Sequence, residues 1–235
     1  MSSNYGCCAV IAAAGTSSRM NLKITKQFLP LFGMPAVLRT ILTFEAAKKV
    51  NSIVIVCRPE DQQQMNIVVK GCGAKKVTAI VSGGNTRQQS VAAGIAAAPP
   101  ETGWLAIHDG ARPLITAEKI DECISDAQKF GASALAVPVK DTIKMIDEDQ
   151  FVVSTPQRKL LWAVQTPQVF EREIYEKAMK QAENNGFDYT DDCQLLENAG
   201  VKVHLCMGSY ENIKLTTPDD IIAAETILRR REGLL

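Results

Sequence analysis

Residues 7–30 read CCAVIAAAGTSSRMNLKITKQFLP, an apolar run that passes without a break into small residues and then into cations. The apolar part, residues 7–13, is continuous rather than alternating, which is typical of a strand buried on both faces of a parallel sheet. The part that follows contains Arg19, Lys23 and Lys26 but no acidic residue. Small residues let backbone N–H groups approach oxygen atoms closely, and cations neutralise phosphate charge. The stretch therefore predicts a buried strand that ends in a cradle for a polyanion. The alternative is a flexible surface loop with incidental lysines, which Lys23 fits better.

The rest of the chain repeats this alternation of apolar runs and helical segments. Further buried strands are predicted at residues 52–57, 76–81, 104–109, 133–139 and 201–206. Apolar residues three and four apart predict helices at residues 35–49, 60–70, 86–98, 116–130, 171–185 and 218–232. Such alternation is typical of the α/β class, here with a doubly wound, mostly parallel sheet.

Residues 139–161 break the pattern. Two short alternating runs, TIKMI and FVVS, flank the acidic turn DEDQ at residues 147–150. This arrangement predicts a β-hairpin or arm outside the main sheet. No internal repeat, low-complexity tract or clear linker divides the chain, so we expect a single domain over residues 1–235 with 139–161 as a protruding arm.

The composition argues against several classes of protein. The 26 basic and 26 acidic residues balance, unlike the basic excess of a non-specific nucleic-acid or membrane-surface binder. No apolar run approaches the roughly 20 residues that cross a bilayer, and the N-terminal residues do not resemble a signal peptide. The seven cysteines form no CxxC pair, and with two distant histidines they do not predict a zinc site. We therefore expect a cytoplasmic protein that binds neither nucleic acid nor membrane.

A glycine-rich motif, SGGNTRQQS at residues 82–90, follows the third predicted strand. In open α/β sheets the carboxyl ends of the strands form the edge where ligands bind. Gly83, Gly84, Asn85 and Ser90 are therefore candidates for hydrogen bonds to the edge of a base. The alternative is a tight turn followed by an ordinary helix cap, with Thr86 or Asn85 as the capping residue.

A second motif, HDGARP at residues 108–113, ends the fourth predicted strand. Asp109 at this position suits Mg²⁺ or sugar hydroxyl groups, whereas His108 is expected to be packed or hydrogen-bonded rather than catalytic. The chain contains no GxSxG nucleophile elbow, so a serine hydrolase is not supported. The region after the first strand matches neither GxGxxG nor GxxxxGK[ST], so neither a dinucleotide site nor a P-loop is supported.

Polar side chains in the C-terminal half complete the candidates: Thr142, Arg158, Thr166, Thr190 and Lys214. Lys214 is the most informative, because it interrupts an apolar run just before the last predicted helix. A lysine in that position either extends to solvent or points into a pocket.

Taken in order, six motifs resemble those of one enzyme family. They are AAAGTSSRM (12–20), TKQFLPLFGMP (25–35), HDGARP (108–113), VPVKDTIK (137–144), QTPQ (165–168) and ENIKLTTPDD (211–220). The chain resembles the 2-C-methyl-D-erythritol 4-phosphate cytidylyltransferases, nucleotidyltransferases with a Rossmann-like sheet, over essentially its whole length. The resemblance implies transfer of CMP from CTP to the polyol phosphate, with release of pyrophosphate and with Mg²⁺ as cofactor.

The resemblance also implies roles for individual residues. Arg19 and Lys26 match the pair that stabilises the transition state at the α-phosphate, and Arg158 and Lys214 match the pair that positions the acceptor phosphate. The implied contacts to nucleotide or polyol are Ala13, Ala14, Gly15, Gly84, Asn85, Ser90, Asp109, Gly110, Arg112, Thr142, Thr166 and Thr190. Asp109 is also the candidate metal ligand, with Mg²⁺ held mainly by the triphosphate. The arm at 139–161 is similar to the family's dimerisation arm and implies a homodimer.

The absence of an evident catalytic base agrees with this chemistry. The attacking group would be a phosphate oxygen that is already ionised at neutral pH, so the protein supplies position and positive charge. Two alternatives stay open. A ribitol 5-phosphate cytidylyltransferase would share KQFLP, QTPQ and the lysine at 214, and a non-catalytic module would bind the nucleotide without turnover.

Overall fold

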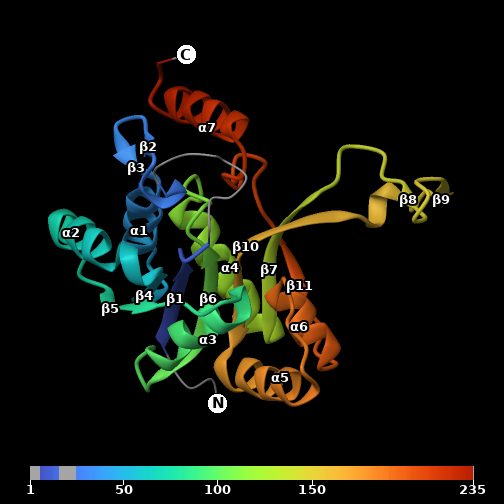
Figure 1. The fold of residues 1–235 in the computed structure, drawn as a ribbon, viewed down its shortest axis with the longest axis horizontal. Helices are drawn as coiled ribbons and strands as arrows, with labels where there is room; N and C mark the ends of the chain where they lie inside the picture. Colours follow the sequence, from blue (N-terminus) through green and yellow to red (C-terminus); the bar gives the residue numbers. More distant parts are fainter. Residues whose placement is uncertain (1–5, 16–24, 235) are drawn as a thin grey trace.

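The computed structural model describes residues 6–15 and 25–234, and its described core is a seven-stranded sheet. The strand order is β11-β7-β10-β6-β1-β4-β5, and β10 runs antiparallel to both of its neighbours while the other strands share one direction. The strands are β1 (Gly6–Ala12), β4 (Val50–Cys57), β5 (Val77–Ser82), β6 (Thr102–Asp109), β7 (Ala132–Pro138), β10 (Trp162–Glu171) and β11 (His204–Met207). This architecture confirms the predicted α/β class with a mostly parallel, doubly wound sheet (Figure 1).

Helices cover both faces of the sheet, as Figure 1 shows. The first face packs against α1 (Ala36–Ala46), α2 (Gln62–Cys72) and α4 (Ala117–Phe130). The second packs against α3 (Arg87–Ala96), α5 (Arg172–Asn185) and α6 (Asp192–Asn198). The C-terminal helix α7 (Pro218–Arg231) packs on a separate cluster with β2 (Pro30–Leu31), which pairs with β3 (Met34–Pro35).

The central strand β1 shows why the sequence run 7–13 lacks alternation. Cys7, Ala9 and Ile11 belong to the cluster under the first face, whereas Val10 belongs to the cluster under the second. All four side chains are buried, because β1 pairs with β4 on one side and β6 on the other and helices cover both faces. A strand in this position needs apolar residues at every site.

Strand β10 and helix α6 were not predicted from the sequence. Strand β10 enters the sheet between β6 and β7, and its register with β7 shifts between Val164 and Gln168. Helix α6 is only seven residues long. Because β10 is antiparallel, its first residues lie at the same edge of the sheet as the last residues of the parallel strands.

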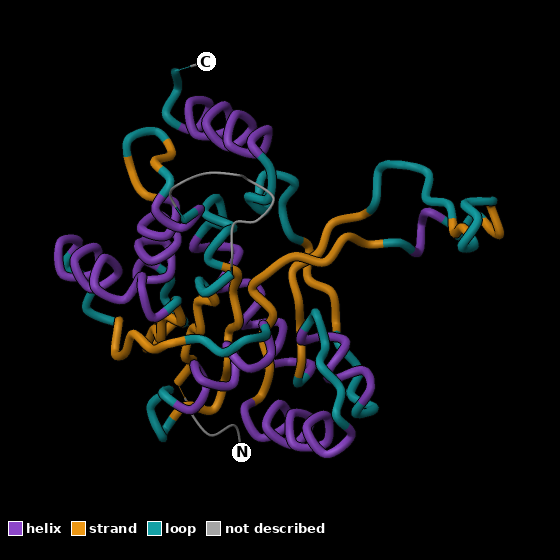
Figure 2. Tube along the Cα trace, viewed as in Figure 1, coloured by secondary structure: helices purple, strands orange, loops and turns teal. Residues whose placement is uncertain are grey.

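The segment between β7 and β10 leaves the sheet as a long excursion (Figure 2). It carries the separate two-stranded sheet of β8 (Met145–Ile146) and β9 (Val152–Ser154), together with the short 3₁₀ helix η3 (Arg158–Leu160). The hairpin predicted from TIKMI and FVVS is therefore present outside the main sheet. Its apolar residues Phe151 and Val153 are 71% and 65% exposed.

Within residues 6–15 and 25–234, no helix is both long and apolar enough to cross a membrane.

Candidate functional site

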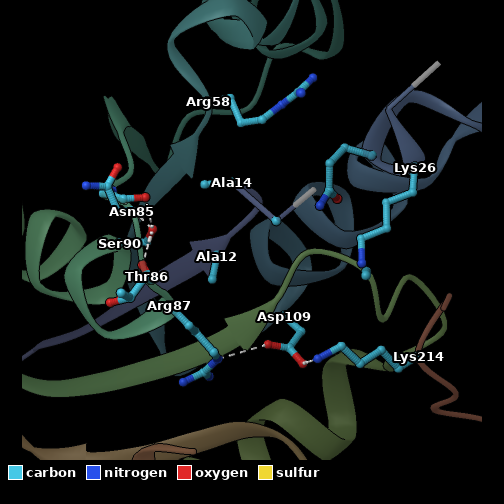
Figure 3. Close-up of a pocket in the computed structure, with 14 residues that line it drawn as sticks. Ala12, Ala14, Lys26, Arg58, Asn85, Thr86, Arg87, Ser90, Asp109 and Lys214 are labelled. Atoms are coloured by element: carbon cyan, nitrogen blue, oxygen red, sulfur yellow. Dashed lines mark hydrogen bonds and ion pairs between the residues drawn. The ribbon is translucent and has the colours of Figure 1, made fainter. Parts of the chain in front are cut away.

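A cleft of about 460 Å³ opens at the carboxyl ends of the parallel strands. It lies at the end of β1, where the sheet continues through β4 on one side and through β6 on the other. Doubly wound proteins bind ligands at this point of reversed strand order. Figure 3 shows the cleft with its lining side chains. The lining residues are Ala12, Ala14, Gly15, Lys26, Gln27, Arg58, Gly84, Asn85, Thr86, Arg87, Ser90, Asp109, Ala111 and Lys214.

The segment that follows β1 forms one wall of the cleft. Ala13 is buried, and its backbone N–H donates to Val56 O at 2.7 Å, which ties the start of the segment to β4. Ala14 and Gly15 line the cleft, and Lys26 reaches it from the 3₁₀ helix η1 (Lys26–Phe28). The predicted residues Arg19 and Lys23 lie outside the described residues.

The glycine turn after β5 forms the opposite wall. The Gly84 backbone N–H donates to Ser90 Oγ at 3.2 Å, and Ser90 Oγ donates to Thr86 O at 2.9 Å. A Cβ atom on Gly83 would lie 2.6 Å from Ala14 Cβ and 2.7 Å from Ser90 Oγ. Glycine is therefore required at 83, because the turn packs directly on the segment after β1.

Thr86 resolves one question that the sequence left open. Its side chain accepts a hydrogen bond from Gln89 N at 3.2 Å and caps α3, so Thr86 rather than Asn85 is the helix cap. The backbone N–H of Asn85 donates to Gln89 Oε1 at 2.9 Å. Both Asn85 and Ser90 nevertheless line the cleft. The capped turn thus serves as cleft wall and helix start at once.

Asp109, at the end of β6, is surrounded by three cations, of which Figure 3 shows Arg87 and Lys214. Its Oδ2 lies 2.7 Å from Lys214 Nζ and 3.8 Å from Arg112 Nε, and its Oδ1 lies 3.6 Å from Arg87 Nε. Burial alone would raise the pKa of Asp109. The combined attraction of Lys214, Arg87 and Arg112 outweighs burial and holds this pKa well below its ordinary value. Asp109 is therefore an ionised carboxylate that gathers positive charge around the floor of the cleft.

Arg87 is a cleft residue that the sequence analysis missed. It is the first residue of α3, directly after the cap Thr86, and its Nη2 lies 2.6 Å from Asp192 Oδ2. Although burial lowers the pKa of Arg87, the two carboxylates Asp192 and Asp109 raise it by more. The signal available in the sequence was an arginine directly after a glycine turn and a capping threonine, which places it at the ligand edge.

His108 and Thr166 form the support beneath Asp109. Thr166 Oγ1 accepts a hydrogen bond from the Asp109 backbone N–H at 3.0 Å and lies 3.0 Å from His108 Nδ1. His108 Nε2 lies 3.2 Å from Arg112 O, so a neutral ring that donates from Nε2 and accepts at Nδ1 satisfies every group. Burial lowers the pKa of His108 to about 4, against an ordinary value of 6.5. The expectation that His108 is packed and hydrogen-bonded is confirmed.

Two other predicted residues lie beside the cleft. Gly110 donates its backbone N–H to Ala12 O at 2.9 Å, and a Cβ at that position would lie 3.2 Å from Ala13 Cβ. Arg112 donates from Nη1 to Asn212 O at 2.7 Å, which fixes the segment just before Lys214. Both residues therefore join the loop after β6 to neighbouring parts of the site.

The chain does not bring three of the predicted residues into its own cleft. Thr142 and Arg158 are exposed on the arm, where Arg158 Nη1 donates to Lys140 O at 3.1 Å. Thr190 is exposed in the segment before α6. None of the three lines the cleft of the described chain.

Arg58, at the end of β4, is a further cation that the sequence analysis did not select. It lines the cleft and donates to both carboxylate oxygens of Asp61, at 2.8 and 3.0 Å. Its Nη2 also donates to Thr25 Oγ1 at 2.8 Å. Arg58 therefore holds the residue that directly precedes Lys26.

The donor set of the cleft bears on Mg²⁺. Asp109 is the one carboxylate among the described lining residues, and no group of three or more His, Cys, Asp or Glu gathers as metal ligands in the described part of the chain. A magnesium ion in nucleotide enzymes is commonly held by one or two carboxylates together with substrate phosphates. The cleft fits an ion that arrives with a triphosphate, and it does not fit a metal bound by protein alone.

These features suit a class of protein. A mostly parallel α/β sheet whose carboxyl edge combines a glycine turn, one carboxylate and several converging cations suits a nucleotidyltransferase. The sequence profile of the 2-C-methyl-D-erythritol 4-phosphate cytidylyltransferases matches residues 7–230, and the chain belongs to this family.

Individual relatives agree over nearly the whole length. The 2-C-methyl-D-erythritol 4-phosphate cytidylyltransferase of Desulforamulus reducens is 46% identical, with 95% of this chain and 96% of that protein covered. That of Pelotomaculum thermopropionicum is 45% identical, with 97% and 96% covered. Among solved structures, the 4-diphosphocytidyl-2C-methyl-D-erythritol synthase of Anaerococcus prevotii is similar with a TM-score of 0.87 at 31% identity, over 96% of this chain and 97% of the other. The Thermus thermophilus cytidylyltransferase gives a TM-score of 0.76 at 28% identity, over 95% and 99%.

Proposed function

We propose that this chain transfers CMP from CTP to 2-C-methyl-D-erythritol 4-phosphate and releases pyrophosphate. The observation that carries the proposal is the convergence of Lys26, Arg87 and Lys214, from three separate segments, on one cleft walled by glycine turns. Such a cleft suits a nucleoside triphosphate and a second phosphate, since both need cations and close backbone approach.

The reaction forms one bond at phosphorus and breaks another. An oxygen of the acceptor phosphate attacks the α-phosphorus of CTP, and the bond from that phosphorus to the bridging oxygen of the β-phosphate breaks. The bridging oxygen leaves with pyrophosphate. The attacking oxygen is already ionised, so no side chain has to remove a proton, which agrees with the neutral, buried state of His108.

Each cation has a distinct task in this proposal. Lys26, together with Arg19, stabilises the charge that develops at the α-phosphate. Lys214 orients the acceptor phosphate for in-line attack. Ala14 and Gly15 provide backbone contacts to the triphosphate, while Gly84, Asn85 and Ser90 contact the cytosine. Asp109 accepts hydrogen bonds from sugar hydroxyl groups.

Asp109 is also the side chain that would hold Mg²⁺, with the phosphate oxygens of CTP as the other ligands. When bound, the ion neutralises the triphosphate and stabilises the leaving pyrophosphate. The protein's own contribution is the set of fixed cations around the cleft floor.

The arm at 139–161 bears on the oligomeric state. We propose a cytoplasmic homodimer in which the arm at 139–161 brings Thr142 and Arg158 to the partner's cleft. In support, the arm exposes several large apolar side chains, among them Phe151 and Val153, which is typical of a surface covered by another chain. Sedimentation should give a dimer for the wild type and a monomer for Phe151→Ser combined with Val153→Ser. A fully active wild-type monomer would contradict this part of the proposal.

A pyrophosphate-release assay tests the proposed reaction. CTP and Mg²⁺ are supplied with either 2-C-methyl-D-erythritol 4-phosphate or ribitol 5-phosphate, and we expect turnover with the first. Faster turnover with ribitol 5-phosphate would contradict the proposed identity of the acceptor. Binding of CTP without turnover on either acceptor would indicate a non-catalytic nucleotide-binding module.

A further inference from the structure

A row of side chains with alternating charge runs from the cleft into the interior. Lys214 Nζ lies 2.7 Å from Asp109 Oδ2, and Asp109 Oδ1 lies 3.6 Å from Arg87 Nε. Arg87 Nη2 lies 2.6 Å from Asp192 Oδ2, and the hydroxyl of Tyr175 donates to Asp192 Oδ1 at 2.6 Å. Figure 3 shows the part of the row that faces the cleft, with Asp109 between Arg87 and Lys214.

The inner end of the row is rigidly held. Tyr175 is fully buried on α5 and Asp192 is 3% exposed at the start of α6. The neighbouring residue Asp191 caps α6, and its Oδ2 accepts from Gln168 Nε2 of β10 at 2.9 Å. Asp192 therefore cannot move far, and a buried carboxylate needs a cation close to it. Arg87 supplies that charge while its other edge faces the cleft.

At the outer end of the row, Lys214 has two partners to bind, Asp109 and the acceptor phosphate. Lys214 is assigned to the acceptor phosphate, yet in the structure its ammonium group is in contact with Asp109. When Lys214 turns to a phosphate, Asp109 keeps Arg87 and Arg112 as its cations. The guanidinium of Arg112 is also committed to the carbonyl of Asn212. Arg87 is thus the cation fixed in place on the side of Asp109 away from Lys214.

We infer that Arg87 is a positioning residue, which holds the Asp109 carboxylate in place and keeps it neutralised so that Lys214 is released to the acceptor phosphate. The inference rests on the proposed function and goes beyond it by adding Arg87 and, behind it, Asp192. Without Arg87, Asp109 retains Lys214 more strongly, so acceptor binding and turnover suffer more than CTP binding does.

The test compares neutral variants by steady-state kinetics and by CTP titration. Arg87→Gln alone leaves Asp192 buried without its cation, so the main variant is Arg87→Gln combined with Asp192→Asn, which removes both charges together. We expect the KM for 2-C-methyl-D-erythritol 4-phosphate to rise and kcat to fall, with a combined loss of about 10- to 100-fold, by analogy with groups that orient the ligands of a metal ion. The Kd for CTP should change less than threefold. Guanidinium ion added to Arg87→Ala should restore part of the lost activity.

Two comparisons separate this role from a merely structural one. Arg172→Gln removes an exposed ion pair, with Glu176 at 2.7 Å, at a position that does not line the cleft, and its kinetics should match those of the wild type. Asp192→Asn added to Arg87→Gln should cause no further kinetic loss, because Asp192 acts through Arg87. The inference is overturned if the double variant keeps the wild-type KM for the acceptor, or if only its thermal stability changes. Absence of turnover in the wild type would instead overturn the proposed function.

Discussion

Replacing Thr166 with valine should destabilise the protein far more than the loss of one surface hydrogen bond would. Thr166 is 3% exposed, and its hydroxyl is the partner of two buried groups, the Asp109 backbone N–H and His108 Nδ1, each at 3.0 Å. Valine keeps the shape of the side chain but can neither accept from Asp109 nor donate to His108. Both groups would then be buried without a partner.

The size of the effect follows from these two contacts. A buried polar group that loses its partner costs about 1–3 kcal/mol, and two such groups cost about 2–6 kcal/mol. Valine has no hydroxyl that must be taken out of water on folding, which offsets part of this cost. The expected loss in the free energy of unfolding is therefore about 2–4 kcal/mol. A typical domain has a stability of about 5–15 kcal/mol, so the loss is readily measured.

Urea unfolding at pH 7 measures this loss, and Thr40→Val provides the matched control. Thr40 is also fully buried, but both contacts of its hydroxyl, with Ala36 O and Gly110 O, are 3.5 Å long. At that length a hydrogen bond contributes little, so Thr40→Val should cost less than about 1 kcal/mol. Equal losses of stability for the two valine variants would refute the idea that Thr166 is the required hydrogen-bond partner of the Asp109 backbone N–H and of His108 Nδ1.

Three further predictions follow from the site. Burial lowers the pKa of His108 to about 4, against an ordinary value of about 6.5. Between these two pH values the unfolded chain binds a proton at His108 that the folded chain does not. The free energy of unfolding should therefore fall by up to about 3 kcal/mol as the pH drops from about 6.5 to 4. The difference in unfolding free energy between wild type and His108→Gln should therefore be smaller at pH 4.5 than at pH 7, and a constant difference would contradict this. Lys214→Ala should lower kcat about 10²- to 10³-fold in the pyrophosphate assay, whereas Lys177→Ala, at an exposed ion pair, should leave kcat unchanged. Gly83→Ala should cost about 1–3 kcal/mol in urea unfolding, because its Cβ would meet Ala14 at 2.6 Å, whereas Gly15→Ala, which meets no described atom within 4 Å, should fold normally.

The buried strands were predictable because burial on both faces leaves a simple mark on the sequence. The run at 104–109 falls within β6, and the run at 52–57 falls within β4. Strand β10 was missed for a physical reason. Its centre holds Gln165, Thr166, Pro167 and Gln168, which resembles a polar turn. The polar side chains of Gln165, Thr166 and Gln168 are tolerated there because each hydrogen-bonds to another segment, at Ser209 O, the Asp109 backbone N–H and Asp191 Oδ2 respectively.

The site was predictable where a motif sits at a strand end and unpredictable where a contact is purely tertiary. Gly84 and Asp109 stand out in sequence because they follow apolar runs, and both line the cleft. The position of Arg87 after a glycine turn is visible in the sequence, but its partner Asp192 lies more than a hundred residues later in the chain. No local pattern could indicate that pair.

The excursion that carries the arm begins and ends at neighbouring points. The backbone N–H of Val139 donates to Leu161 O at 3.0 Å, and Pro138 of β7 is paired with Trp162 of β10. Whatever lies between these points is closed by the sheet itself, and lengthening a closed loop twofold costs only about 0.6 kcal/mol. The fold of the sheet therefore tolerates a change in the length of this segment. Chimaeras that exchange it between relatives at this junction should keep a folded body. Because the segment also carries Thr142 and Arg158, such an exchange would change the affinity for a partner and the arm's share of the site together.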